Sequence, residues 1–329
     1  MRGPTPAPLR TAPTAAGVGA PPAMGVLPSA EVLRRLELSV TRRLDGLLHG
    51  DYRGLVPGHG SEPGETRRYQ PGDDVRRIDW NVTARAIETH VRESIADREL
   101  ETWVVLDASA SMAFGTANCE KRDLALAATA AVGYLTARGG NRIGAVLSPG
   151  PHGATSTVPA RSGRVPLQAL LRQSLDALRP TGAAPPAGGL SEALERTLRT
   201  VRRRGLVVVI SDFLDPGAWD RPLRSLASRS EVLAVEVGDP RELALPDVGM
   251  LLLVDPETGA EREVNTSDRR FRRRYAEAAA AEREATARRI RRAGADHLVL
   301  STDRDWLVDL ARFVAWRRQR IDAIGRARA

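Results

Sequence analysis

Two apolar runs in the sequence end in an aspartate, and this pattern could provide oxygen ligands for a cation. The first run, WVVLD, ends at Asp107 and is followed by Ser109 and Ser111, and the second, LVVVISD, ends at Asp212. If both runs form adjacent parallel strands, the two carboxylates project into one crevice beyond the carboxyl ends of the strands. An extended Asp-x-Ser-x-Ser loop turns one carboxylate and two hydroxyls to the same side, and Mg²⁺ prefers such oxygen ligands. The pattern is therefore compatible with a Mg²⁺ site.

Other interpretations fit the same residues. An aspartate followed by a serine commonly closes a turn through hydrogen bonds to the backbone, and no ligand is then involved. A strand-terminal aspartate can also be the nucleophile of phosphoryl transfer, so the alternative function is a phosphatase-type enzyme that uses Asp107. Such a site would gain from a second acid two residues later, where this sequence has Ser109. A serine hydrolase is not supported, because no Gly-x-Ser-x-Gly elbow surrounds Ser109 or Ser111.

The elements that would position these residues alternate between strand and helix after residue 101. Short apolar runs separated by amphipathic helices are typical of a parallel sheet covered on both faces. The strand candidates are residues 103–106, 143–148, 206–210, 232–237 and 298–300. The helix candidates lie near residues 120–138, 164–178, 190–203, 217–228, 268–293 and 305–318. This order predicts a doubly wound α/β fold with a mostly parallel, Rossmann-like sheet over residues 101–320, and a β-hairpin at residues 251–254 and 262–264.

The chain before residue 101 divides into two further segments, and a short basic tail follows residue 320. Residues 1–28 are rich in Pro, Ala and Gly, which predicts a disordered tail because they can bury little apolar surface. Residues 29–100 are expected to form a helix that begins at Ser29, followed by a small β-rich lobe. Residues 321–329 form the basic tail.

The lobe contains a charged segment, QPGDDVRRIDW, that has two interpretations. In the first, its Pro and Gly occupy the positions of a type II turn. The charges of the turn would form ion pairs with one another, and Ile78 and Trp80 would pack in the core. The same charges would otherwise be a surface on which a partner docks. The partner-binding candidates are Asp73, Asp74, Arg76 and Arg77.

The composition is that of an ordinary globular protein of a reducing compartment. The apolar content is 42% and the charged content is 27%. No apolar run approaches the roughly 20 residues of a membrane helix, and the N-terminal segment lacks the apolar core of a secretory signal. The single cysteine, Cys119, forbids an internal disulfide. We therefore expect a cytoplasmic protein without a membrane span.

The net charge of +8 raises the question of nucleic-acid binding. Lys121 is the only lysine among the 49 Lys and Arg residues, which indicates a compositional bias. The arginines also alternate with acids along the expected helices, as at Glu284 and Arg288, whose i,i+4 spacing is typical of a solvated helix face. Nucleic-acid binding is therefore the weakest interpretation. It would use the helix near residues 268–293 and the C-terminal residues Arg317, Arg318, Arg320 and Arg326.

Four segments of the chain resemble one bacterial family in their order and spacing. They are RRYQPGDDVRRIDWNVTAR (67–85), VVLDASASMAFG (104–115), VVVISDFLD (207–215) and VGDPRELALPDVGMLLLVDPETG (237–259). The family is the domain-of-unknown-function 58 (DUF58) family, and the resemblance covers roughly residues 30–310. The segment DASAS, from Asp107 to Ser111, is also similar to the first motif of the metal-ion-dependent adhesion site of von Willebrand factor A-like domains.

The resemblance implies a von Willebrand factor A-like α/β domain preceded by a small β-rich lobe. It implies a protein without enzymatic activity that works as an adaptor with a MoxR-type AAA+ ATPase. Many relatives carry two membrane helices near the N-terminus, whereas this sequence has a Pro- and Ala-rich tail and an amphipathic helix there. Membrane anchoring is therefore not expected.

Carried over residue by residue, the adhesion motif places metal ligands at Asp107, Ser109, Ser111 and Asp212. The position of a threonine ligand holds Leu190, which cannot bind a cation, and neither Ser191 nor Thr181 is in register. The resemblance thus implies either a weak, water-rich Mg²⁺ site or a vestigial site whose polar groups brace the loops.

We therefore expect a non-enzymatic protein-interaction module whose binding edge is the crevice at Asp107 and Asp212. An acidic side chain from a partner would complete a bound cation or, without a metal, accept hydrogen bonds from Ser109 and Ser111. No small-molecule substrate is expected.

Overall fold

The structure is a computed structural model of the 329-residue chain, and it describes residues 21, 29–48, 66–70, 78–86, 88–92, 100–148, 154–179, 189–256 and 258–328. The chain forms two compact units. The larger unit contains Met1–Val56 and Leu100–Ala329, and the smaller unit contains Pro57–Glu99. Among the described residues, no helix is both long enough and apolar enough to cross a membrane.

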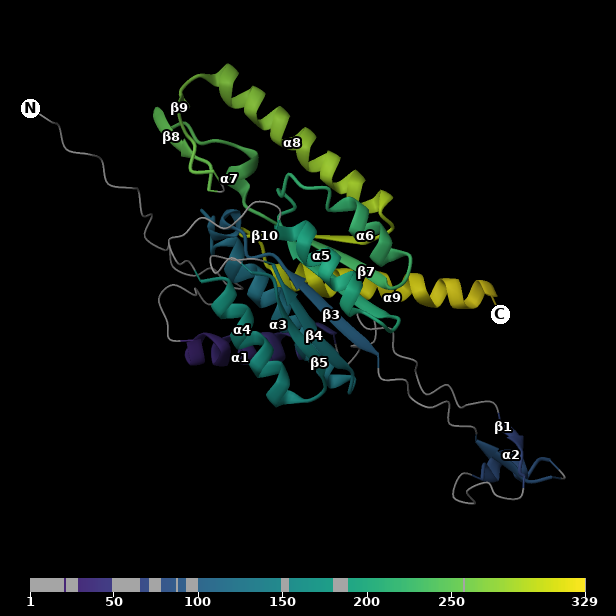
Figure 1. The fold of residues 1–329 in the computed structure, drawn as a ribbon. Coiled ribbons are helices and arrows are strands. Elements are labelled where there is room, and N and C mark those ends of the chain that lie inside the picture. Colours follow the sequence, from purple (N-terminus) through teal and green to yellow (C-terminus); the bar gives the residue numbers. More distant parts are fainter. Residues whose placement is uncertain are drawn as a thin grey trace, which may run out of the picture. The chain divides into compact units, whose positions relative to one another are not determined.

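A six-stranded sheet forms the centre of the larger unit (Figure 1). Its strands are β3 (Glu101–Leu106), β4 (Arg142–Leu147), β5 (Ser156–Arg161), β6 (Gly205–Ser211), β7 (Glu231–Gly238) and β10 (Asp296–Ser301). The order is β10-β7-β6-β3-β4-β5, and all neighbours are parallel except β4 and β5. The predicted α/β fold with a mostly parallel sheet is confirmed. The chain passes from β3 to β4 on one side and returns to β6 on the other, so the chain order reverses at the β3–β6 pair.

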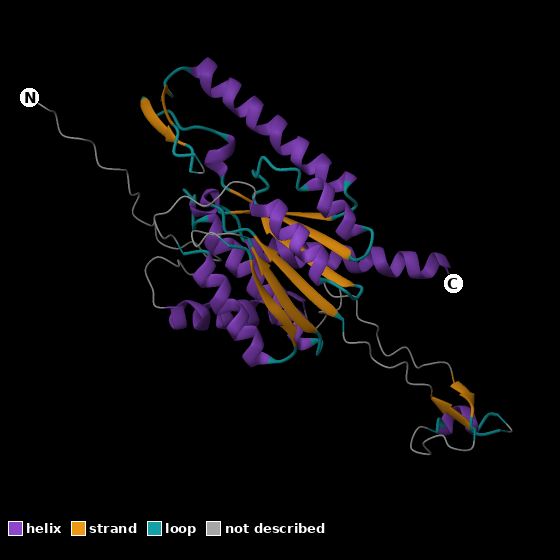
Figure 2. Ribbon diagram, viewed as in Figure 1, coloured by secondary structure: helices purple, strands orange, loops and turns teal. Residues whose placement is uncertain are grey.

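Helices cover both faces of this sheet (Figure 2). Successive strand side chains point to opposite faces, so Val208 and Ile210 pack in one core while Val207 and Val209 pack in the other. The first core is closed by α1 (Ser29–Leu48), α3 (Lys121–Arg138), α4 (Arg164–Ala177) and α9 (Trp306–Arg328). The second is closed by α5 (Gly189–Thr200), α6 (Asp220–Ala227) and α8 (Arg269–Arg292). The loops after β3 and β6 are therefore carried by strands that are packed on both faces.

Helix α1 belongs to the larger unit. Its residues Val32, Leu36, Val40 and Leu44 are buried in the same core as α3 and α9. The sequence interpretation grouped this helix with the small lobe. The structure differs because a stripe of large apolar side chains needs an apolar surface to cover it, and α3 and α9 provide that surface.

The smaller unit contains β1 (Thr66–Arg68) and β2 (His90–Arg92), which pair antiparallel, and the short helix α2 (Trp80–Thr83). Asp79 caps this helix by accepting hydrogen bonds from the N–H groups of Asn81 at 3.0 Å and Val82 at 3.3 Å. The prediction that Trp80 is a core residue is wrong. The capping residue Asp79 is buried instead, and Trp80, which begins the helix, is 70% exposed. The four partner-binding candidates lie outside the described residues: Asp73, Asp74, Arg76 and Arg77.

Three short features follow strands of the main sheet or extend from it. The 3-10 helix η3 (Ala110–Ala113) lies in the loop after β3, and α7 (Pro240–Leu243) follows β7. The strands β8 (Met250–Val254) and β9 (Glu261–Asn265) pair antiparallel and confirm the predicted hairpin. On β8, alternate apolar side chains are exposed, among them Leu252.

Several arginines of the larger unit pair with acids. Arg288 lies 3.5 Å from Glu284 on α8, as their i,i+4 spacing predicted. On α9, Arg317 contacts both Glu231 and Asp296. The side chains of Arg318 and Arg326 lie outside the described part of the chain. Local pairing of this kind favours a solvated charged face over a nucleic-acid surface.

Candidate functional site

The carboxyl ends of β3 and β6 lie side by side. In this parallel pair Leu106 is the partner of Ile210, and the Asp107 N–H donates to the Ile210 carbonyl at 2.9 Å. Asp107 and Asp212 therefore follow adjacent strands at the point where the chain order reverses, which is where ligands bind in open α/β sheets. The adjacency of the two strands, on which the sequence argument depended, is confirmed. The environments of the two acids differ.

Asp107 is buried, with 1% of the residue exposed. Its Oδ1 accepts hydrogen bonds from the Ser109 N–H at 2.9 Å and the Ser148 hydroxyl at 3.3 Å, and its Oδ2 accepts one from the Ser211 hydroxyl at 2.5 Å. Burial, followed by the charge of Asp212, raises the pKa of Asp107 to about 6, although the hydrogen bonds oppose this rise. Asp107 is thus a buried acid held by neutral donors.

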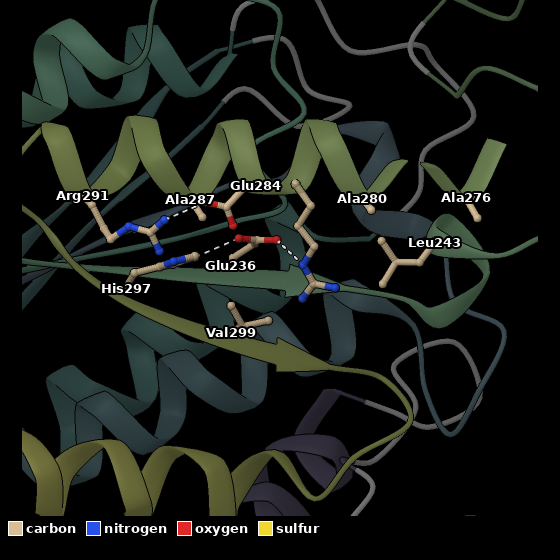
Figure 3. A pocket seen from close by; sticks show the side chains of 10 residues that line it. Glu236, Leu243, Ala276, Ala280, Glu284, Ala287, Arg291, His297 and Val299 are labelled. Carbon is tan, nitrogen blue, oxygen red and sulfur yellow. Dashed lines mark hydrogen bonds and ion pairs between the residues drawn. The ribbon is translucent and has the colours of Figure 1, made fainter. Parts of the chain in front are cut away.

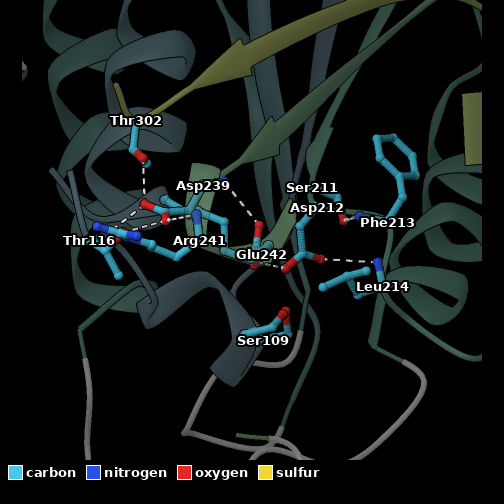
Figure 4. Close-up of polar contacts among 12 residues, drawn as sticks. Ser109, Thr116, Ser211, Asp212, Phe213, Leu214, Asp239, Arg241, Glu242 and Thr302 are labelled. Carbon is cyan, nitrogen blue, oxygen red and sulfur yellow. Dashed lines mark hydrogen bonds and ion pairs between the residues drawn. The ribbon is translucent and has the colours of Figure 1, made fainter. Parts of the chain in front are cut away.

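Asp212 is paired with a lysine. Lys121, the first residue of α3, has no exposed surface, and its Nζ donates to Asp212 Oδ2 at 2.8 Å. The same ammonium donates to Glu242 Oε1 on α7, and Figure 4 shows Asp212 and Glu242 beside each other. Burial alone would lower the pKa of Lys121, but the charges of Asp212 and Glu242 outweigh it, and the pKa is raised. Lys121 is therefore charged at neutral pH.

Glu242 is held in place by a capping box at the start of α7. Its Oε2 accepts a hydrogen bond from the Asp239 N–H at 2.9 Å, and the Asp239 carboxylate accepts one from the Arg241 N–H at 2.9 Å. Asp239 also accepts hydrogen bonds from the hydroxyls of Thr116 and Thr302, each at 2.6 Å. Burial would raise the pKa of Asp239, but these hydrogen bonds outweigh it and lower the pKa. Asp239 thus joins the loops that follow β3, β7 and β10.

Sequence reasoning missed Lys121, Glu242 and Asp239, although two signals pointed to them. The first is that Lys121 is the only lysine in a chain that otherwise uses arginine. The second is the segment from Asp239 to Glu242, DPRE, which has the spacing of a capping box directly after an apolar strand.

A strained turn sets the direction of Asp212. Phe213 has a φ of +57°, and no other non-glycine among the described residues has a positive φ. Its ring packs against Trp219 at a centroid distance of 5.1 Å, and its N–H donates to the Ser211 hydroxyl at 2.8 Å. The next N–H, of Leu214, donates to Asp212 Oδ1 at 3.1 Å. Packing and hydrogen bonds therefore hold a backbone conformation that costs about 1–3 kcal/mol, and such strain is common at functional sites.

The remaining predicted ligands fall into two groups. Ser109 and Ser111 lie together, with their Oγ atoms 3.1 Å apart, and Ser109 is half-buried while Ser111 is buried. Leu190 is buried in the second core, and its N–H donates to Asp215 at 2.9 Å. Thr181 lies outside the described residues. The structure therefore unites the Asp-x-Ser-x-Ser residues and provides no oxygen ligand from the side chain of Leu190.

These residues do not fit a divalent cation. One carboxylate oxygen of Asp212 accepts a hydrogen bond from the Lys121 ammonium, and both oxygens of Asp107 accept hydrogen bonds from the chain. The Lys121 side chain also brings a positive charge to the place where a metal would need negative charge. Within the part of the chain that the structure describes, no group of three His, Cys, Asp or Glu residues is placed to hold a metal ion. The donor set is that of a closed cluster whose acids are already engaged by the chain itself.

Comparison with known proteins identifies the family. Residues 65–285 match the DUF58 family, whose description is "Protein of unknown function DUF58". The chain belongs to this family. The uncharacterized protein Rv1480 of Mycobacterium tuberculosis is 56% identical over 290 residues, which are 88% of this chain and 90% of that protein. The uncharacterized protein MAV169 of Mycobacterium avium is 51% identical over 162 residues, or 49% of this chain and 94% of that protein.

Solved structures with a similar fold have low sequence identity to this DUF58 chain. The conserved hypothetical protein BatB from Bacteroides thetaiotaomicron is 14% identical with a TM-score of 0.43, over 67% of this chain and 99% of that chain. A von Willebrand factor type A structure from Catenulispora acidiphila is 16% identical with a TM-score of 0.31, over 57% of this chain and 43% of that chain.

Two large apolar side chains are exposed beside the charged cluster of the DUF58 chain. Phe114 is 39% exposed, and the Lys121 Nζ lies 5.9 Å from the centre of its ring. Leu214 is 54% exposed and directly follows the strained residue Phe213. We call these two exposed side chains, together with the adjoining polar residues Ser109, Ser111 and Asp212, the β3/β6 edge.

A cavity of about 410 Å³ in the DUF58 chain lies between α8 and the strands β7 and β10 (Figure 3). Its buried acid, Glu236, lies 2.8 Å from the Nε2 of His297 and 3.0 Å from the Nε of Arg283. Both carboxylate oxygens are thus engaged by the chain itself. The acid of this cavity is already paired with two basic groups, and the cavity contains none of the predicted metal ligands.

The phosphoryl-transfer alternative depends on Asp107 reaching a substrate. The buried Asp107 carboxylate accepts hydrogen bonds on both oxygens, including the short one from Ser211. A nucleophile must present an oxygen to the reacting atom. In this geometry the carboxylate braces the loops around it.

Proposed function

We propose that this DUF58 chain is a non-enzymatic protein-binding module that meets its partner at the β3/β6 edge. The observation that carries the proposal is the exposure of Phe114 and Leu214 on two loops that flank one charged cluster. A rigid sheet carries both loops, and binding residues are commonly placed on loops of this kind.

The composition of the edge fits a protein interface. Single exposed apolar residues are common on protein surfaces and need no explanation. Here, however, an exposed aromatic and an exposed aliphatic side chain stand beside the half-buried Ser109 hydroxyl, and interfaces combine apolar anchors with polar groups in this way. Because few anchors are available, the contact fits a transient assembly better than a permanent one.

The charges of the edge favour a partner group that donates hydrogen bonds. The cluster contains three carboxyl groups, those of Asp107, Asp212 and Glu242, and one ammonium, that of Lys121. A partner carboxylate, which the sequence interpretation expected, would meet an excess of like charge. A basic or neutral donor would instead be attracted by the cluster and could bond to the Ser109 hydroxyl.

The family resemblance supplies the first candidate partner. We propose that it is a MoxR-type AAA+ ATPase, for which this chain would act as an adaptor. The support for this partner is the family alone, because no feature of the edge is specific to an ATPase.

A binding measurement with matched variants tests the edge. The intact chain would be immobilised in buffer containing EDTA, and the affinity of a MoxR-type ATPase from the same genome would be measured by biolayer interferometry. We expect Phe114→Asp and Leu214→Asp each to weaken binding by about tenfold or more, because each places a charge in an apolar contact. Leu252→Asp on β8 is the control, since Leu252 and Leu214 are both 54% exposed.

A wrong binding surface and a wrong partner would give different results. Unchanged affinity in both edge variants, or a loss confined to Leu252→Asp, would show that the β3/β6 edge is not the binding surface. If the wild-type chain does not bind the ATPase, the proposed partner is wrong. Turnover of p-nitrophenyl phosphate that is lost in Asp107→Asn would contradict the non-enzymatic proposal.

A further inference from the structure

The lysine at the β3/β6 edge is unusual for this chain. Lys121 is the only lysine among 49 Lys and Arg residues, and its side chain has no exposed surface. Lysine is rarely buried completely unless it is paired. The pairing here is with two acids from different elements, Asp212 after β6 and Glu242 on α7. The position therefore demands a compact cation that the other basic residues of the chain do not supply.

The geometry explains why arginine would not serve. Two carboxylate oxygens converge on one nitrogen, so the donor must be a small group at the end of a thin stem. An ammonium has three donors around a single atom, whereas the guanidinium of arginine is a wide planar fork. A lysine at this position is thus matched to its two acceptors.

The location of Lys121 on its helix also indicates that the ammonium depends on its two acids. It is the first residue of α3, where the helix dipole disfavours a positive charge. The capping box of Glu120 and Asp123 offsets part of this cost. A cation placed against the dipole and out of water must gain more from Asp212 and Glu242 than it loses.

We propose that Lys121 is the resident cation of the β3/β6 edge. Its ammonium supplies the positive charge that a divalent ion supplies in a metal-ion-dependent adhesion site, so this edge neither needs nor binds Mg²⁺ or Mn²⁺. The proposal concerns the chain alone and does not depend on which partner it binds or whether it binds one.

Removal of the Lys121 ammonium should open a site for a divalent ion. Lys121→Ala removes the side chain beyond Cβ and leaves Asp212 and Glu242 without their shared cation. Carboxylate oxygens around a water-filled space suit a hard divalent ion. The variant is therefore expected to gain a Mn²⁺ site that the wild-type chain lacks.

The experiment measures Mn²⁺ binding to the intact chain. Loss of the free Mn²⁺ signal in electron paramagnetic resonance reports binding, and thermal unfolding reports its effect on stability. We expect no binding to the wild-type chain. We expect Mn²⁺ at about a hundredfold excess over its Kd to raise the Tm of Lys121→Ala by about 5 °C. Lys121→Ala/Asp212→Asn is the control and is expected to show no such gain.

Three results would overturn the proposal. The first is Mn²⁺ binding by the wild-type chain that is lost in Asp212→Asn. The second is a folded Lys121→Ala variant that gains no Mn²⁺ binding. If Lys121→Ala is unfolded without metal, Mn²⁺ must restore its thermal transition, and failure to do so is the third. None of these results depends on the ATPase, so they are distinct from a failure of the proposed function.

Discussion

The loops after β3 and β6 share a sequence pattern, but their aspartates are held by different kinds of donor. Each follows a buried apolar strand with an acid, and the two strands are neighbours. Asp107 receives only neutral donors, from Ser109, Ser148 and Ser211, whereas Asp212 receives a buried ammonium. The difference comes from residues far away in the sequence. A strand-end aspartate therefore predicts where a carboxylate lies but not what it binds.

The largest effect is expected when the cation of the second loop is removed. Lys121→Met keeps much of the side-chain volume but leaves the buried Asp212 and the half-buried Glu242 without their partner. Removing one member of a buried pair costs about 3–5 kcal/mol, and we expect a loss of this size in the free energy of unfolding at neutral pH. Urea denaturation followed by circular dichroism measures it.

A double variant shows whether the loss of stability comes from breaking the ion pair of Lys121 and Asp212. Adding Asp212→Asn removes one of the stranded acids, so we expect Lys121→Met/Asp212→Asn to recover about 1–3 kcal/mol relative to Lys121→Met. A loss below about 1 kcal/mol in Lys121→Met, or no recovery in the double variant, would mean that the ammonium does not neutralise a buried cluster.

Asp107, in the loop after β3, should make the stability of the chain depend on pH. Because the pKa of Asp107 is raised from 3.8 to about 6 in the folded chain, the native state binds more protons than the unfolded state between these values. The contribution of Asp107 to stability is present below about pH 4 and is lost as the pH rises through about 6. Relative to wild type, Asp107→Asn should therefore gain about 2–3 kcal/mol between pH 4 and pH 7.

Urea titrations at several pH values measure this difference. Asp303→Asn, which alters an exposed aspartate, controls for the loss of one negative charge. Parallel pH profiles for wild type and Asp107→Asn would contradict the raised pKa. They would also remove the contrast between the two loops.

Much of the sheet, and less of the site, could be predicted from the sequence. Continuously apolar runs locate β3, β4, β6 and β7 because burial on both faces requires them. The strand β5, STVPAR, was missed because it is a half-exposed edge strand with a proline and few apolar residues.

The site could be predicted only where it is local. The Asp-x-Ser-x-Ser loop brings Asp107, Ser109 and Ser111 together through contacts within a few residues. Lys121 was interpreted as a matter of composition, because nothing near it in the chain indicates that Asp212 and Glu242 are its partners. Those contacts span 91 and 121 residues and depend on the sheet order and on the start of α7.

A smaller effect distinguishes the donors within the first loop. Ser211 donates to Asp107 at 2.5 Å and accepts a hydrogen bond from the Phe213 N–H at 2.8 Å. Ser211→Ala removes both interactions and leaves the buried N–H without this acceptor, so we expect a loss of about 2 kcal/mol and a further rise in the pKa of Asp107. Ser148→Ala removes a longer bond of 3.3 Å to Asp107 and also the acceptor of the Ala108 N–H at 2.8 Å. Because its bond to Asp107 is longer than that of Ser211, it should cost somewhat less, about 1.5 kcal/mol. Denaturation of both variants gives the order, and the reverse order would contradict the geometry around Asp107.

The smallest expected effect is that of salt on the second loop. Raising NaCl from about 0.1 to 1 M shortens the Debye length from about 10 to 3 Å, which screens exposed charges far more than buried ones. The side chains of Lys121 and Asp212 are 0% and 3% exposed, whereas those of the helix pair Arg199 and Glu195 are 67% and 60% exposed. The stability difference between wild type and Lys121→Met should therefore change by less than about 0.5 kcal/mol across this range. A change above about 1 kcal/mol would show that ions reach the ammonium, and the second loop would then be an open charged site and not a closed ion pair.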